Sequence, residues 1–122
     1  MKAIVIGAGI GGLSAAVALK QSGIDCDVYE AVKEIKPVGA AISVWPNGVK
    51  CMAHLGMGDI METFGGPLRR MAYRDFRRGE NMTPFSLDPP IGRTGRRPCR
   101  LSRAKLQREM LDSWGGDSGP LG

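Results

Sequence analysis

A glycine motif between two short predicted strands constrains this chain more than any other feature of its sequence. An uncharged apolar run leads into Gly7-x-Gly9-x-x-Gly12, an alanine-rich segment follows, and a second short strand is predicted from Cys26 to Tyr29, before Glu30, which lies 18 residues past Gly12. Strand, glycine turn, helix, strand and acid in this order are typical of a βαβ unit that binds a dinucleotide. We therefore predict an α/β fold that begins with such a unit.

Each glycine of the motif has a separate physical role. Gly7 permits the tight turn from strand to helix, and Gly9 lets the backbone approach a pyrophosphate because it has no Cβ. Gly12 lets the helix pack closely on the sheet. The helix then directs its N-terminal N–H groups and the positive end of its dipole at the phosphates.

The acid at the end of the second strand indicates which dinucleotide fits. The carboxylate of Glu30 is placed to accept hydrogen bonds from an adenosine ribose. A negative charge at this point repels the 2′-phosphate of NADP. The sequence therefore predicts FAD or NAD as the ligand.

The charge is unevenly distributed along the chain. Residues 1–68 carry a net charge of −1, whereas residues 69–122 contain eleven arginines and carry a net charge of +6. A basic segment can bind nucleic acid, but here prolines, glycines and acids separate the arginines and few aromatic residues accompany them. We expect a solvated face or a face for an anionic small molecule, and no nucleic-acid partner.

Metal and membrane sites are not expected. The three cysteines are far apart, and the single histidine, His54, has only Cys51 near it at helical spacing, so a metal site is not supported. We expect the cysteines to be free buried thiols in a reducing compartment.

The uncharged run over residues 3–19 contains four glycines and is short for a membrane span. These features favour a cytoplasmic protein without a membrane partner.

Patterns beyond Glu30 predict further elements and one small domain. A polar connection precedes a strand with a glycine at its start, and the last helix has apolar residues on one side. The expected elements are a strand at 39–44, a helix capped by Asn47 and ending before Gly58, a helical turn at 59–64, a hairpin of strands 70–76 and 82–87, a loop at 88–98, a helix capped by Ser102 that ends at Trp114, and an unstructured tail at 115–122.

The last helix indicates an incomplete sheet. It is typical of a crossover helix, after which a further parallel strand should follow, yet the tail after it has no apolar pattern. We therefore expect an incomplete Rossmann-like βαβ unit with a two-stranded parallel core.

Several segments carry a resemblance to a known family. The βαβ unit is followed by GAAIS at 39–43, PNG at 46–48 and LSRAKLQ at 101–107. With these segments the chain resembles the para-hydroxybenzoate-hydroxylase-like flavin monooxygenases. Residues 1–83 look very similar to the bacterial FAD-dependent urate hydroxylases of that family, and the resemblance is expected to extend over residues 1–114 and to weaken after Pro84.

The resemblance implies a fold and a set of cofactor contacts. Residues 1–114 would be part of a FAD-binding domain, and the hairpin at about 68–90 would begin the sheet of a substrate domain. Besides Gly7, Gly9, Gly12 and Glu30, the residues that the resemblance assigns to the cofactor are Gly11, Ala31, Ser43 and Arg103. No residue of this chain matches the catalytic arginine of the urate enzymes, so we name no catalytic residue.

The resemblance also implies a reaction for an intact enzyme. NADH and O₂ would be consumed and urate would be converted to 5-hydroxyisourate, with FAD as the cofactor. Later motifs of the family do not occur in these 122 residues, so we expect an N-terminal fragment that is inactive alone. Two alternatives remain open, which are a non-catalytic dinucleotide-binding module and a basic interaction fragment.

Overall fold

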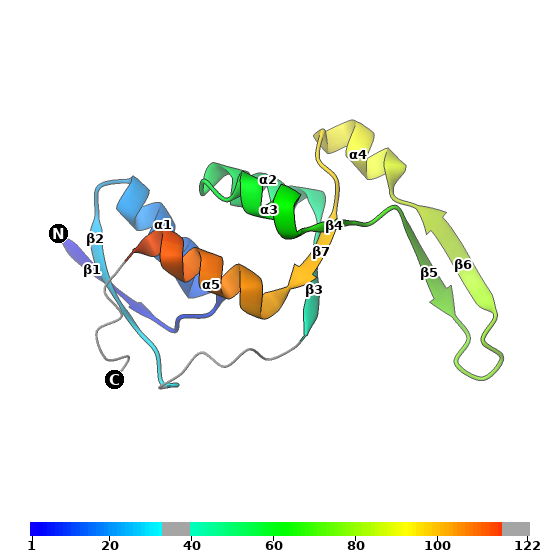
Figure 1. Cartoon of the computed structure of the whole chain (residues 1–122), viewed down its shortest axis with the longest axis horizontal. Helices are drawn as coiled ribbons and strands as arrows, with labels where there is room; N and C mark the ends of the chain where they lie inside the picture. The colour runs from blue at the N-terminus through cyan, green and yellow to red at the C-terminus, as the bar shows by residue number, and fades with distance from the viewer. Residues whose placement is uncertain (33–39, 116–122) are drawn as a thin grey trace. The chain divides into compact units, whose positions relative to one another are not determined.

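The computed structural model describes residues 1–32 and 40–115, which form two compact units. Unit 1 contains Met1–Ala41 and the segment that begins at Ser102, and unit 2 contains Ile42–Leu101. Figure 1 follows the helices and strands of both units along the chain. The predicted tail lies outside the described residues, except for Gly115.

Unit 1 contains the predicted βαβ unit. The βαβ unit consists of β1 (Lys2–Ile6), α1 (Ile10–Gln21) and β2 (Asp25–Tyr29), and unit 1 also contains α5 (Arg103–Trp114). Strands β1 and β2 pair in parallel, with Lys2 opposite Asp25 and Ile6 opposite Tyr29. Helix α1 packs on both strands, and α5 packs along α1, as Figure 1 shows. The expected two-stranded parallel core is thus confirmed.

The alternation of side chains along β1 explains where the core of unit 1 lies. Val5 points to the side that α1 covers, whereas Ile4 and Ile6 point to the other side and are 66% and 80% exposed. From the helices, Leu13 and Met110 are completely buried. Each buried side chain of this size contributes about 1.5–3 kcal/mol to folding, so the contact of α1 with α5 provides much of the stability of unit 1.

The ends of α1 and α5 are fixed by a glycine, a side-chain cap and a lysine. Gly23 has a φ of +73°, which allows the chain to leave α1. The Ser102 hydroxyl accepts a hydrogen bond from the Lys105 N–H, which confirms the predicted N-cap of α5. The ammonium of Lys20 donates to the carbonyl oxygen of Trp114 at 2.7 Å. A cation at the C-terminal end of α5 is favourable for the helix dipole.

Unit 2 contains the remaining elements. They are β3 (Ala41–Val44), α2 (Pro46–His54), α3 (Gly58–Phe64), β4 (Gly66–Pro67), β5 (Arg70–Arg74), β6 (Asn81–Ser86), α4 (Asp88–Thr94) and β7 (Cys99–Ser102). Strands β3, β7 and β4 form a sheet in this order, and β5 and β6 form a separate antiparallel hairpin. The strand before α2, the helical turn and the hairpin are confirmed.

Two predictions for unit 2 are wrong. Asn47 does not cap α2, because the N-cap is Trp45, two residues earlier, and the helix begins at Pro46. Proline suits the first helical position since its fixed φ is already helical and that position needs no N–H donor. The loop predicted at 88–98 is also wrong in its first part, because Asp88–Thr94 form α4 and only residues 95–98 connect it to β7. The two prolines in the first turn of α4 are tolerated because the first N–H groups of a helix have no acceptor within it, and Gly95 with a φ of +65° ends the helix.

The side chains of unit 2 correct one further expectation. Cys99 is buried but Cys51 is exposed, so the cysteines are free thiols but not all of them are buried.

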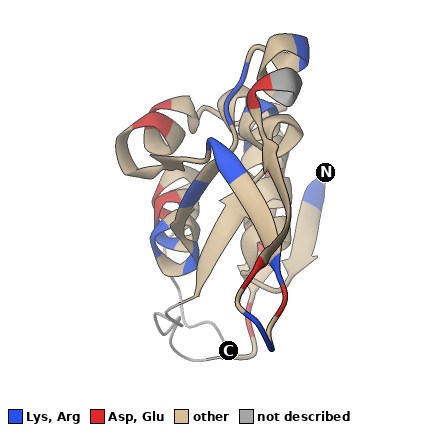
Figure 2. Ribbon diagram, turned by 90° about the vertical axis from the view of Figure 1, so that its right-hand side faces the viewer, with Lys and Arg blue, Asp and Glu red and all other residues tan. Residues whose placement is uncertain are grey.

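Figure 2 shows acidic segments beside basic ones at the tip of the β5–β6 hairpin, where the Arg77 N–H donates to the Asp75 carboxylate at 2.8 Å. Among the described residues no helix is both long and apolar enough to cross a membrane.

Candidate functional site

The turn between β1 and α1 has the backbone shape that the glycine motif requires. Gly7 has a φ of +97°, a conformation that side chains with a Cβ rarely adopt. Its N–H donates to the Tyr29 carbonyl oxygen at 2.6 Å, so the turn starts from the end of the parallel sheet. Gly9 is the N-cap of α1, and its carbonyl oxygen accepts from the Leu13 N–H at 2.9 Å.

Gly12 is the point of closest contact between α1 and this turn. A Cβ added to Gly12 would overlap the carbonyl oxygen of Gly7, and it would lie 3.3 Å from the Cγ1 atom of Val5. No other residue type fits at this position without a shift of the backbone. The close packing predicted for Gly12 is therefore confirmed by the geometry.

Gly9 and Gly11 have a different environment. A Cβ at either position would meet no atom within 4 Å, so these glycines border open space. The first turn of α1 contains no acidic residue, and no side chain caps it. The N–H groups at the start of a helix have no acceptor within the helix and carry a partial positive charge. The open space beside Gly9 and Gly11 is therefore suited to an anionic group such as a pyrophosphate.

Glu30 lies at the edge of this space and is tied to the turn. One oxygen of its carboxylate accepts from the Ala8 N–H at 2.7 Å, and the other accepts from the Val32 N–H at 3.2 Å. The hydrogen bond from Ala8 is the main cause that lowers the pKa of Glu30 below its ordinary value of 4.5. The carboxylate is thus an anion at neutral pH. Because a carboxylate has about four acceptor positions, it can still accept hydrogen bonds from ribose hydroxyls.

Helix α5 contributes a residue to the turn that the sequence motifs do not predict. The side-chain amide of Gln107 donates to the Ala8 carbonyl oxygen at 2.7 Å, and Gln107 is only 6% exposed. The sequence does contain a signal for it. Gln107 lies three residues after Ala104 and three before Met110, so it is a polar residue on the apolar face of an amphipathic helix.

The structure brings some of the predicted cofactor residues together. Gly7, Gly9, Gly11, Gly12 and Glu30 all border the turn between β1 and α1 within unit 1. The remaining predicted residues are not part of this turn. Ala31 is exposed beside Glu30, and Ser43 is exposed on β3 in unit 2. Arg103 is the half-buried first residue of α5, and its backbone N–H donates to the Ala40 carbonyl oxygen at 3.0 Å.

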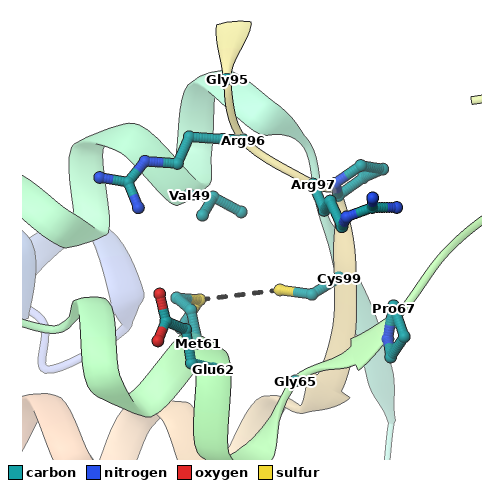
Figure 3. Close-up of a pocket in the computed structure, with 10 residues that line it drawn as sticks. Val49, Met61, Glu62, Gly65, Pro67, Gly95, Arg96, Arg97 and Cys99 are labelled. Carbon is teal, nitrogen blue, oxygen red and sulfur yellow. Dashed lines mark hydrogen bonds between the residues drawn. The ribbon is translucent and has the colours of Figure 1, made fainter. Parts of the chain in front are cut away.

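Unit 2 contains a cavity of about 410 Å³ that none of the predicted residues lines. Figure 3 shows the Arg96 side chain reaching over it near Val49, whereas the Arg97 side chain points away. On the opposite side the Cys99 thiol lies 3.8 Å from the sulfur of Met61. Burial raises the pKa of the Cys99 thiol, so this thiol is neutral at physiological pH. Among the residues that the structure describes, no group of three or more acidic, histidine or cysteine side chains is arranged to hold a metal ion.

Comparison with known proteins also points to a dinucleotide-binding fold. Residues 5–69 match the family model described as "NAD(P)-binding Rossmann-like domain". The chain is 88% identical over all 122 residues to a FAD-dependent urate hydroxylase of Klebsiella pneumoniae, and 67% identical over 122 residues to one of Klebsiella oxytoca. It spans 32% of the length of each of these relatives.

A solved structure agrees in fold as well as in sequence. Klebsiella pneumoniae HpxO complexed with FAD and uric acid matches 97% of this chain at 88% identity and a TM-score of 0.84, and the match covers 30% of that chain. These comparisons confirm the α/β Rossmann-like fold and the resemblance to bacterial urate hydroxylases. The expectation that the resemblance ends at Trp114 is wrong, because the identity holds over the full chain.

Proposed function

Because the chain belongs to the NAD(P)-binding Rossmann-like domain family, we propose that its turn between β1 and α1 holds the adenosine diphosphate half of FAD. The observation that carries this proposal is the open space beside Gly9 and Gly11 at the start of α1, with the Glu30 carboxylate at its edge. The K. pneumoniae structure that contains FAD supports FAD as the dinucleotide.

The residues of the turn fit the two halves of this ligand. The first N–H groups of α1 and the positive end of its dipole bind the pyrophosphate, and Glu30 accepts hydrogen bonds from the ribose hydroxyls. Gly7 and Gly12 hold the backbone in the shape that leaves room for the phosphates. The anionic Glu30 also disfavours a 2′-phosphate by charge repulsion, which selects FAD or NAD over NADP.

We further propose that the chain contributes this half-site to a flavin monooxygenase that acts on urate, with NADH as co-substrate. Bound FAD supplies the redox and oxygen chemistry, and the protein binds and orients it. Support comes from the identity to urate hydroxylases and from the K. pneumoniae structure with uric acid. In this proposal residues 1–114 form part of the FAD-binding domain, and the hairpin at about 68–90 begins the sheet of the substrate domain. The 122 residues alone are expected to be inactive, because the proposed contacts concern only the nucleotide.

Isothermal titration calorimetry with FAD, NAD and NADP tests the proposal. FAD and NAD are expected to bind with similar affinity, because both contain the adenosine diphosphate group that the turn contacts. NADP should bind at least about tenfold more weakly. The Glu30→Ala variant should lose about tenfold or more in affinity for NAD, since hydrogen bonds to a charged group contribute about 1.5–3 kcal/mol.

A matched control and two outcomes make this test decisive. Asp59→Ala removes an exposed carboxylate of α3 in unit 2 and should leave the affinity for NAD unchanged. Absence of NAD and FAD binding by the unmodified chain would contradict the proposal. Equal affinity for NAD and NADP would contradict the role of Glu30.

The alternative of a non-catalytic dinucleotide-binding module differs in one observable. The motif residues that meet at the turn are those suited to an adenosine diphosphate group, which both hypotheses require. The alternative requires that no longer form of the protein retains a yellow flavin, whereas a flavin monooxygenase retains one. An absorption spectrum of the natural protein purified from its host separates the two hypotheses.

A further inference from the structure

The Ala8–Gly9 peptide group lies in the middle of the glycine turn and is held by a residue from the other end of the chain. Its carbonyl oxygen, which belongs to Ala8, accepts the hydrogen bond from Gln107 at 2.7 Å. The preceding peptide group is held as well, because the Ala8 N–H donates to Glu30. Ala8 is completely buried and Gln107 is only 6% exposed, so their hydrogen bond is shielded from exchange with water, whereas the bond to Glu30 is partly buried.

The orientation of this peptide group determines whether the Ala8 carbonyl oxygen or the Gly9 N–H faces the open space proposed for the pyrophosphate. The described residues contain no cis peptide bond, and in a trans peptide the N–H points opposite to the carbonyl oxygen. With the Ala8 oxygen turned to Gln107, the Gly9 N–H points away from α5. A Cβ at Gly9 would meet no atom within 4 Å, so the space around this residue is open.

A flipped peptide would have the opposite effect. The Ala8 carbonyl oxygen would leave Gln107 and turn toward the space proposed for the pyrophosphate, where its partial negative charge would repel the ligand. Gly9 offers little resistance to such a flip, because glycine populates both signs of φ with similar ease. A donor that holds the carbonyl oxygen is therefore needed to keep the turn in the binding conformation.

We propose that Gln107 is a positioning residue for the dinucleotide site, which locks the Ala8–Gly9 peptide so that the Gly9 N–H faces the phosphate. This inference rests on the proposed binding of a dinucleotide at the same turn. It adds that a residue of α5, 99 positions along the chain from Ala8, determines the affinity for the phosphate part of the ligand.

Titrations of the 122-residue chain with ADP and with adenosine, followed by NMR, test the inference. Adenosine lacks the phosphates, so the ratio of the two affinities isolates the phosphate contribution. Gln107→Met keeps the length and packing of the side chain but removes the donor. It is expected to weaken ADP binding about fivefold or more while adenosine binding changes little. Gln107→Asn, whose amide is one methylene too short to reach the turn, should behave in the same way.

Two controls separate positioning from a general loss of stability. Leu111→Ala removes a half-buried side chain from the same helix and lowers stability, but it should leave the ratio of ADP to adenosine affinity unchanged. Gln21→Met makes the matched substitution at an exposed glutamine of α1 and should change neither affinity. In the free Gln107→Met variant, the amide signal of Gly9 should shift and broaden as the peptide flips.

The outcomes distinguish this inference from the proposed function. If the unmodified chain binds ADP and Gln107→Met has the same ratio of affinities, the positioning role is overturned and the proposed function stands. If both Gln107 variants unfold while Leu111→Ala folds, Gln107 serves the core and the inference is overturned. If the unmodified chain does not bind ADP, the proposed function fails and the inference fails with it.

Discussion

Replacing Gly12 by alanine should destabilise the chain, although alanine is the better helix former. Within a helix, the change from glycine to alanine is worth about 1 kcal/mol in favour of folding. At Gly12, however, the new Cβ would overlap the Gly7 carbonyl oxygen and would lie 3.0 Å from the Gly7 carbonyl carbon. Both atoms belong to the backbone of the turn, so they cannot move aside as the end of a flexible side chain can.

The expected magnitude follows from these two opposing effects. Overpacking of a core costs about 1–3 kcal/mol, and an obstacle of backbone atoms places Gly12→Ala at or above the upper end of that range. After the gain in helix propensity is subtracted, we expect a net loss of about 2 kcal/mol. Folded domains are stable by only about 5–15 kcal/mol in total, so this loss is readily measured.

Gly11 provides the matched control in the same turn of the same helix. A Cβ at Gly11 meets no atom within 4 Å, so only the helix propensity acts. Gly11→Ala should therefore stabilise the chain by about 0.5–1 kcal/mol. Urea unfolding followed by far-ultraviolet circular dichroism measures both variants. If Gly12→Ala is as stable as Gly11→Ala, the close contact between α1 and the turn does not exist and the reasoning is refuted.

Three further predictions follow from individual residues. Gly9→Val should reduce NAD affinity about tenfold or more, because its side chain fills the open space proposed for the pyrophosphate; calorimetry with NAD checks this, and unchanged affinity would contradict it. Because hydrogen bonds lower the pKa of Glu30 in the folded chain, the stability that they provide should be present above pH 4.5 and be lost as the pH falls through the lowered pKa; thermal unfolding across this range should show an acid-dependent loss that Glu30→Gln reduces, and equal pH profiles would oppose it. Cys51 should react with a maleimide before Cys99 does, since Cys99 is 6% exposed and burial raises its pKa; mass spectrometry of the folded chain measures the order, and equal rates would count against the buried position of Cys99.

The parts of the fold that local sequence rules control could be predicted from the sequence. The βαβ unit, the cap at Ser102 and the hairpin depend on glycine positions, capping and alternation, which act over a few residues. Helix α4 was not predicted because its two prolines and Gly92 are typical of a loop, although a proline in a first helical turn costs little. Strand β7 alternates between buried and exposed residues but has only four of them, which is too short a pattern to predict a strand, and its pairing with β4 depends on contacts distant in sequence.

The site shows the same division between local and distant effects. The glycines and Glu30 follow one another in a known spacing, and the structure brings them to one turn. Gln107 contacts that turn from 99 residues away, and no spacing rule connects it to Ala8. Its position on an apolar helix face indicates that it needs a partner, but only the packing of α5 on α1 identifies the partner.

A calorimetric titration of the purified 122-residue chain with FAD tests the central claim most directly, with Glu30→Ala titrated in parallel. The proposal predicts saturable binding of FAD to one site per chain, with an affinity close to that for NAD and at least about tenfold weaker in the Glu30→Ala variant. No binding of FAD by the folded chain, or equal binding by the two proteins, would contradict the claim that the turn from Gly7 to Gly12 and Glu30 hold the nucleotide.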